Sequence, residues 1–201
     1  MKCLIDNGDL GTIRRVTTAF TFNWDTIPVG DIRLNKELGG GSLGDLGYYC
    51  VGAIIWAFDA LPEKVFATAR YHAGIDLNLS GLLWFNDARM ASFDCGFDTG
   101  SRRWLEVAGT KASLVCDDIF MPCKEKSARF WIHVKDGQST EHTVETSIQE
   151  VNMIERFSTI VQSGNLETRF VDNAINTMHI CDALCESAQR GEIVKPSRST
   201  S

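Results

Sequence analysis

The sequence predicts an α+β fold in which helices cover one face of a mostly antiparallel, open β-sheet. Segments that alternate apolar and polar residues succeed one another between residues 63 and 147, and their short connections favour antiparallel pairing. Helical periodicity occurs before these segments and after them, but not between them. Strands that are grouped in this way, instead of alternating with helices, are typical of the α+β class.

The first part of the chain contains one strand and one helix. Residues 1–5 resemble the end of a helix, and "IDNGDLG" (5–11) has the composition of a turn. "TIRRVTTAFTFNW" (12–24) is β-branched and aromatic, which predicts a strand. Residues 25–41 form a polar loop of a length that is usually functional or disordered. A helix is expected from about 43 to 58.

The remaining elements follow from their periodicity. Further strands are expected at 63–72, 75–85, 88–98, 102–109, 112–118, 128–134 and 141–147. Helices are expected at 147–164 and 172–191, each ended by a glycine. The first aligns Val151, Ile154, Phe157 and Val161 on one stripe, and the second aligns Ala174, Met178, Cys181, Leu184 and Cys185. "EIVKP" adds an edge strand, so residues 1–196 form one domain and residues 197–201 a disordered tail.

Composition excludes several classes of protein. A chain of 201 residues with 44% hydrophobic residues can form one domain with a core. A net charge of −6 and a pI near 5.2, with no basic block, argue against nucleic acid as a partner. The apolar run 50–58 is too short to span a bilayer, and no secretion signal opens the chain. We therefore expect a cytoplasmic protein with no membrane partner.

The seven cysteines do not indicate a disulfide framework or a metal site. Their number is odd, no zinc-type CxxC pair occurs, and most lie among apolar residues, where a free cysteine acts as a small hydrophobe. Cys181 and Cys185 are four residues apart with His179 nearby, which would make half a metal site. A buried helix face explains the same spacing better, so no metal is expected.

"GGGSLGDLGYYC" (39–50) carries the most informative pattern. Its Gly-x-Gly-x-x-Gly spacing matches the dinucleotide fingerprint, but the charged "DIRLNKEL" precedes it where a buried strand is required, and no βαβ alternation follows. A helix start fits better. Ser42 and Asp45 match a capping box, and the three glycines permit close packing or positive φ.

Asp45 and Tyr49 are four residues apart and share one helix face. In one interpretation Asp45 only caps the helix and the Tyr49 hydroxyl lies at the surface. In the other, the tyrosine passes a proton to or from a substrate oxygen while a hydride moves elsewhere. Because the free pKa of tyrosine is about 10, that role needs nearby positive charge, and a lysine from elsewhere would be the natural complement. The spacing alone leaves both interpretations open.

Several segments, in order, resemble the C-terminal domain of the glucose–fructose oxidoreductase/inositol dehydrogenase/MocA family. They are "DNGDLGTIRRVTTAF", "DIRLNKELGGGSLGDLGYYCVGAIIWAF", "LPEKVFATA", "LEVAGTKASLVCDD", "ERFSTIVQSG" and "CDALCESAQRGEIVKP". Ala112 stands where the family usually has glycine. The resemblance implies a glyceraldehyde-3-phosphate dehydrogenase-like C-terminal domain. Its Asp-x-Gly-x-Tyr/His motif falls on Asp45, Gly47 and Tyr49. It implies that Tyr49 donates or accepts the proton and that Asp45 helps to position substrate, as in the dihydrodiol and xylose dehydrogenase branch.

The resemblance also implies a missing half. Members of the family begin with a Rossmann domain that binds NAD or NADP and ends in a Glu-Lys-Pro motif, and neither feature occurs here. The chain is therefore expected to be a C-terminal half, as a fragment or truncated gene product, of an oxidoreductase acting on CH–OH groups of a sugar, cyclitol, other polyol or diol. Alone, it is expected neither to bind NAD(P) tightly nor to turn over substrate. The alternative is a non-enzymatic module that dimerises or binds a partner through its sheet.

Four further residues are candidates for substrate binding. Arg33 precedes the glycines and suits a substrate hydroxyl or a phosphate, although a solvated loop arginine is the simpler interpretation. Phe22 and Trp24 end the first strand and can wall a substrate ring or pack in the core. His179 lies on the last helix and either faces the site or is a surface histidine. Tryptophans on the strands, at 84, 104 and 131, predict a homodimer through the sheet face.

Overall fold

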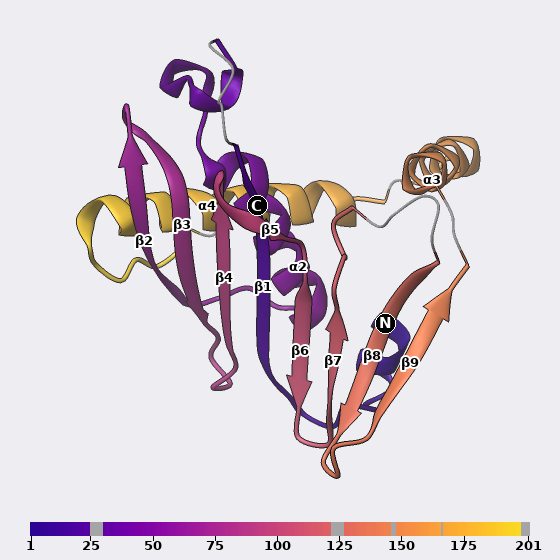
Figure 1. The fold of residues 1–201 in the computed structure, drawn as a ribbon. Coiled ribbons are helices and arrows are strands. Elements are labelled where there is room, and N and C mark those ends of the chain that lie inside the picture. Colours follow the sequence, from indigo (N-terminus) through magenta and orange to yellow (C-terminus); the bar gives the residue numbers. More distant parts are fainter. Residues whose placement is uncertain (25–29, 122–126, 146–147, 166, 198–201) are drawn as a thin grey trace.

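The computed structural model describes residues 1–24, 30–121, 127–145, 148–165 and 167–197, and it confirms the α+β fold (Figure 1). The strands are Ile13–Asn23 (β1), Lys64–His72 (β2), Ile75–Trp84 (β3), Met90–Gly96 (β4), Asp98–Arg102 (β5), Leu105–Gly109 (β6), Ala112–Cys116 (β7), Ala128–Val134 (β8) and Ser139–Val144 (β9). The α-helices are Lys2–Asp6 (α1), Tyr48–Phe58 (α2), Gln149–Ser163 (α3) and Arg169–Arg190 (α4). Single turns occupy Ile32–Leu34 (η1), Lys36–Leu38 (η2) and Leu43–Gly47 (η3). The predicted tail lies outside the described residues from 198 onward.

The strands form one open sheet in the order β2-β3-β4-β1-β6-β7-β8-β9, and β5 pairs with the end of β1. The consecutive pairs β2–β3, β3–β4, β6–β7 and β8–β9 are antiparallel, as their short connections predict. β1 and β4 pair in parallel, with Arg15 opposite Met90 and Thr21 opposite Gly96. The first strand is therefore central, where its Val16 and Ala19 are fully buried.

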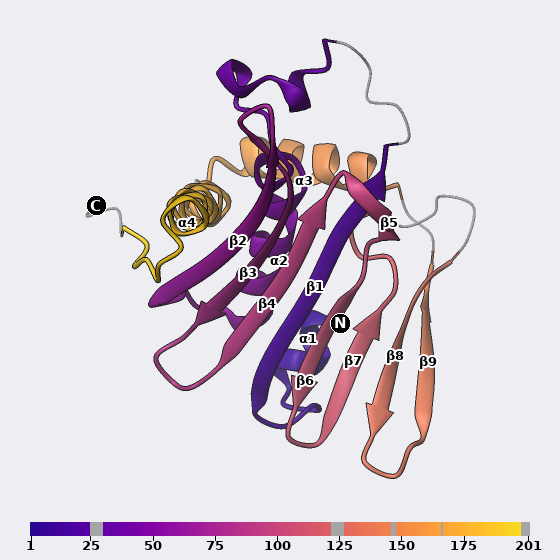
Figure 2. The same ribbon diagram turned by 60° about the vertical axis from the view of Figure 1, so that its left-hand side comes forward.

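One face of the sheet carries the hydrophobic core. Along β3 every second residue is buried, so Leu77, Leu79 and Leu83 point to the same side. α2 and α4 lie across this side (Figure 2). Fully burying one such leucine stabilises the fold by about 1.5–3 kcal/mol. The predicted edge strand is a single bridge between Val194 and Val65.

The two C-terminal helices differ in burial. The stripe predicted on α4 packs only in part, since Cys181 and Leu184 are buried but Met178 is 48% exposed. The stripe on α3 is exposed along its length, with Phe157 at 67%. α3 lies to one side of the helices that cover the sheet (Figure 1). No helix in the described part of the chain is both long and apolar enough to cross a membrane.

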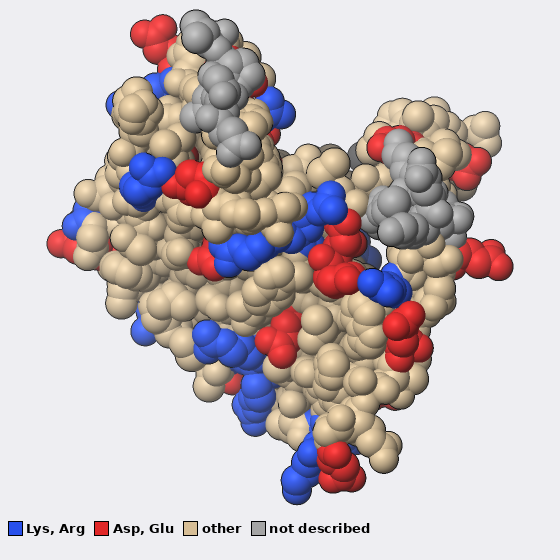
Figure 3. Space-filling view, in the orientation of Figure 1, with Lys and Arg blue, Asp and Glu red and all other residues tan. Residues whose placement is uncertain are grey.

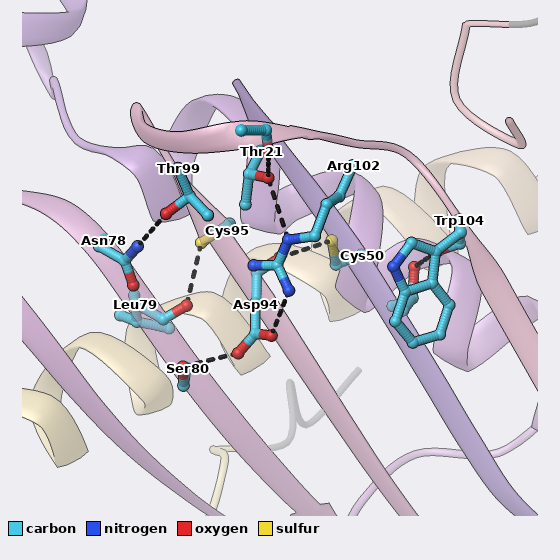
Figure 4. A network of polar contacts seen from close by, with 12 residues as sticks. Thr21, Cys50, Asn78, Leu79, Ser80, Asp94, Cys95, Thr99, Arg102 and Trp104 are labelled. Carbon is cyan, nitrogen blue, oxygen red and sulfur yellow. Dashed lines mark hydrogen bonds and ion pairs between the residues drawn. The ribbon is translucent and has the colours of Figure 1, made fainter. Parts of the chain in front are cut away.

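The opposite face of the sheet is polar and open. Acidic and basic side chains intermingle on it (Figure 3). Asp94 on β4 accepts hydrogen bonds from Ser80 Oγ at 2.6 Å and from Arg102 at 3.0 Å, and Arg102 Nε also donates to Thr21 Oγ1 at 3.2 Å (Figure 4). Trp104 lies half-buried beside this network. The side chains of the Arg102–Asp94 ion pair are 34% and 40% exposed.

Candidate active site

The three consecutive glycines form a tight bend before α2. Gly39 has φ +74° and Gly41 has φ +130°, which is the backbone freedom that the glycines were expected to permit. The Gly41 N–H donates to the carbonyl of Arg33 at 2.9 Å. A Cβ on Gly40 would lie 2.5 Å from the same carbonyl oxygen. The bend therefore brings the backbone of residue 33 back against the start of the helix.

The predicted capping box is wrong. Ser42 has helical dihedral angles and makes no cap with its own helix. Its hydroxyl donates to Asp76 Oδ2 at 2.8 Å, and the Leu43 N–H donates to the same oxygen at 2.7 Å. The helix start is thus capped by a carboxylate from β3, and the Asp45 side chain does not serve as the cap. Burial raises the pKa of Asp76.

The first turn of this helix is a π-turn, η3. The Tyr48 N–H reaches the carbonyl of Leu43, five residues earlier. Gly47 makes this turn possible, because a Cβ there would lie 2.8 Å from the Leu43 side chain and 3.0 Å from Cys95 Sγ. Single π-turns inside helices often occur at functional sites. The turn carries Asp45, and the α-helical part begins immediately before Tyr49.

Asp45 is paired with Arg33. Arg33 Nε lies 2.8 Å from Asp45 Oδ2, and its Nη1 lies 3.6 Å from Asp31 Oδ1. The hydrogen bond and charge of Asp45 raise the pKa of Arg33. The guanidinium also lies 5.8 Å from the centre of the Trp24 ring. The arginine is therefore held by a carboxylate and an aromatic ring, while 39% of its side chain is exposed.

A cleft of about 780 Å³ lies in front of these groups. Five of the six residues predicted for the site line it together: Phe22, Trp24, Arg33, Asp45 and Tyr49. The rest of the lining is mostly apolar and comes from β1, η3, the segment after β7 and α3: Phe20, Leu46, Ile119, Phe120, Met121, Gln149, Glu150 and Met153. This volume is that of a site for a small molecule.

Tyr49 lies at the wall of the cleft, with its ring beside two phenylalanines. Ring centres are 5.8 Å apart to Phe20 and 6.3 Å apart to Phe120, both edge-on. The tyrosine is 53% exposed, so it is not a core residue. A tyrosine that is half-exposed at the wall of a cleft can exchange a proton with a bound molecule.

Phe20 and Phe120 were missed by the sequence interpretation. Their rings stack at 4.8 Å with an angle of 6° between planes. Phe20 is two residues from Phe22, so strand alternation places both on one side and could have indicated it. Phe120 follows β7 in a segment with no periodicity, and no pattern predicts that it reaches the cleft.

His179 is not brought to the cleft. It is half-buried on α4 beside Leu61, Pro62 and Asn176, in a separate small pocket. Thr177, only two residues away on α4, instead lines a groove of about 370 Å³ that adjoins the cleft along Tyr49. A helix turns by about 100° per residue, so two residues this close face different directions. Within the described residues, no three side chains are gathered as metal ligands.

Comparisons with known proteins agree with this architecture. The model of the GFO/IDH/MocA C-terminal domain matches residues 1–115. The chain is 28% identical over 191 residues to D-xylose 1-dehydrogenase (NADP(+)) 2 of Haloferax volcanii, which is 93% of this chain and 57% of the relative. It is 32% identical over 124 residues to the mouse trans-1,2-dihydrobenzene-1,2-diol dehydrogenase, which is 61% of this chain and 36% of the relative.

A solved structure shows the same fold. A 3-ketoreductase from Actinomadura kijaniata, in complex with NADP and TDP-benzene, superposes with a TM-score of 0.85 at 23% identity. The match covers 92% of this chain and 57% of that protein. The chain thus spans little more than half the length of relatives that it matches almost from end to end.

Proposed function

This chain belongs to the GFO/IDH/MocA C-terminal domain family, and on that premise we propose that it is the substrate-binding half of an NAD(P)-dependent oxidoreductase. The substrate class is a sugar, cyclitol or diol, oxidised or reduced at a CH–OH group. The observation that carries the proposal is the convergence of Tyr49, Asp45, Arg33, Trp24 and Phe22 on one cleft. Relatives named as xylose and dihydrodiol dehydrogenases support the reaction class.

The glycine bend at residues 39–41 does not fit a dinucleotide. The glycine bend is occupied by the carbonyl of Arg33 and the carboxylate of Asp76, which leaves no free cradle for a phosphate. We therefore assign the nucleotide to a separate Rossmann domain and propose that the chain alone neither binds NAD(P) tightly nor turns over substrate. Isothermal titration calorimetry on the 201 residues tests this, and nanomolar NAD(P) binding would contradict it.

Tyr49 is the proposed proton donor and acceptor. The nicotinamide cofactor supplies the hydride chemistry, whereas this chain binds the substrate and moves the proton. In oxidation, the substrate hydroxyl gives its proton to the Tyr49 oxygen, and in reduction the new alkoxide oxygen takes it back. A tyrosine must lower its pKa from about 10 to act as a base near neutrality. A cation supplied by the other domain is the proposed source of that shift.

The Arg33–Asp45 pair has two proposed roles. An uncompensated carboxylate one helical turn from Tyr49 would oppose loss of the tyrosine proton, and the guanidinium at 2.8 Å neutralises it. The pair also offers both donors and an acceptor to substrate hydroxyls. Trp24 and Phe22, together with the stacked Phe20 and Phe120, supply flat apolar walls that suit the ring of a sugar or cyclic diol.

Reconstitution tests this function. The chain is combined with a separately expressed nucleotide-binding domain, and NAD(P)-dependent turnover is measured on a panel of sugars, cyclitols and diols. Tyr49→Phe should lower kcat about 100- to 10,000-fold. Tyr71→Phe is the matched control, because Tyr71 lies on β2 and does not line the cleft. Restored activity that Tyr49→Phe leaves unchanged would remove the proton-transfer role.

We also propose that the chain forms a homodimer through the open sheet face. The partly exposed ion pairs and half-buried tryptophans of this face support it, since interfaces are enriched in tryptophan and arginine. The same face supports the alternative function, a non-enzymatic dimerisation or binding module. Sedimentation velocity should show a dimer that Arg102→Glu weakens. A dimer with no activity on reconstitution would favour the alternative.

A further inference from the structure

We propose that Asp76 is a positioning residue for the reaction, holding the turn that presents Asp45 and Tyr49 to the cleft. The inference rests on the proposed function for its catalytic consequence, but its structural part stands on contacts alone. Asp76 lies at the start of β3 and is 34 residues distant in sequence from Ser42, whose hydroxyl it binds. It does not line the cleft.

One carboxylate oxygen of Asp76 accepts the hydrogen bonds of the residues that begin the helix carrying Asp45 and Tyr49. Oδ2 accepts from the Leu43 N–H at 2.7 Å and from Ser42 Oγ at 2.8 Å. Backbone N–H groups in the first turn of a helix have no partner within the helix and need one from outside. Since Ser42 is fully buried, water does not replace this partner. The negative charge also lies at the positive end of the helix dipole.

The second oxygen of Asp76 packs against Gly41, the last glycine of the bend. Gly41 packs so closely on Oδ1 that a Cβ there would overlap it. The next two residues are tied to Oδ2, so three consecutive residues are fitted around one carboxylate. The position of the helix start is therefore set by the sheet, through β3, and not only by the helix itself.

That position reaches the cleft over a short path. η3 begins at Leu43, whose N–H is bound by Asp76, and Asp45 follows two residues later in the same turn. Tyr49 follows on the next turn. Two residues before it, Gly47 packs so closely on Cys95 that a Cβ there would lie 3.0 Å from Cys95 Sγ. A displacement of about 1 Å in reacting groups can cost about 100-fold in rate. Loss of the Asp76 carboxylate should therefore lower kcat without removing any group that touches substrate.

Amide hydrogen–deuterium exchange on the 201-residue chain tests the structural part. Asp76→Ala should speed exchange of the amides from Leu43 to Cys50 about tenfold, the effect of losing one helix cap. Asp76→Asn, which keeps one acceptor oxygen, should lie between Ala and wild type. Asp87→Ala is the matched control, because this carboxylate caps the turn at the other end of β3, at Arg89. Unchanged exchange at residues 46–50 in both Asp76 variants would overturn the proposal.

The kinetic part uses the reconstituted enzyme. Asp76→Ala should lower kcat at least tenfold with KM changed less than threefold, and Asp76→Asn should recover part of kcat. If Asp76→Ala does not fold, Asp76→Asn alone decides, with kcat reduced as the supporting result. Wild-type kcat in both Asp76 variants would overturn the proposal. If wild-type protein has no activity with any nucleotide domain, the proposed function fails, whereas the exchange experiment still decides the role of Asp76 in the helix start.

Discussion

Replacement of Gly41 by alanine is predicted to destabilise the protein strongly, although Gly41 lies in a glycine-rich loop. Gly41 has φ +130°, a region that side-chain-bearing residues occupy at a cost of about 1–3 kcal/mol. The new Cβ would also overlap Asp76 Oδ1 and push the carboxylate away from Ser42 and Leu43. Loss of one buried hydrogen bond there costs a further ~1–3 kcal/mol. The expected loss in free energy of unfolding is about 3–5 kcal/mol.

Gly39→Ala provides the matched control two residues away. Gly39 also has positive φ, +74°, but no heavy atom lies within 4 Å of the position its Cβ would take. Its replacement should cost only about 1 kcal/mol. Urea unfolding followed by tryptophan fluorescence, with both variants and wild type at one pH, measures the difference. If the two variants lose equal stability, the close packing of Gly41 on Asp76 is wrong, whatever the function of the chain.

Three other predictions concern charge and thiols. Burial raises the pKa of Asp76 above its ordinary value of 3.8. The wild-type protein should therefore lose stability relative to Asp76→Asn as pH rises through the raised pKa. Urea unfolding midpoints of the two proteins that differ by a constant amount from pH 4 to 8 would contradict this. Arg33→Met should cost less than about 1 kcal/mol in urea unfolding, since its ion pair is partly exposed. Alkylation followed by mass spectrometry at pH 8 should label the exposed Cys3 and spare the buried Cys50 and Cys181, because burial raises the pKa of both thiols, that of Cys181 to about 12.

Local patterns predicted most of the elements. The alternating segment 75–85 and the Gly-ended helical segment 172–191 correspond to β3 and α4 within a few residues. The same local signals placed Asp45 and Tyr49 together, because both lie within two turns of one helix. Phe22 and Trp24 were accessible to prediction because they end a strand that the β-branched composition identifies.

Contacts between distant segments were not predictable in this way. Ser42 and Asp45 have the composition of a capping box, yet the cap comes from Asp76. The carboxylate of Asp76, which β3 holds at the helix start, accepts hydrogen bonds from the Leu43 N–H and from Ser42 Oγ. The parallel pairing of β1 with β4 joins strands that no short turn connects. The apolar stripe of α3 has the pattern of a packed helix and nevertheless lies exposed, so periodicity predicted the helix but not its burial.

The glycine-rich spacing that imitates a dinucleotide fingerprint has a different physical cause. Gly40 and Gly41 donate to the carbonyls of Asn35 and Arg33, both at 2.9 Å, which closes residues 33–41 into a compact loop. Closure is what brings the Arg33 side chain to Asp45, since the loop folds back on the helix that carries the carboxylate. A phosphate cradle needs backbone N–H groups that point to an empty space, and these point to carbonyls. These glycines therefore build the substrate side of the site by letting the loop close. Closure requires that residue 40 carry no Cβ, and the Asp76 contact requires the same of residue 41.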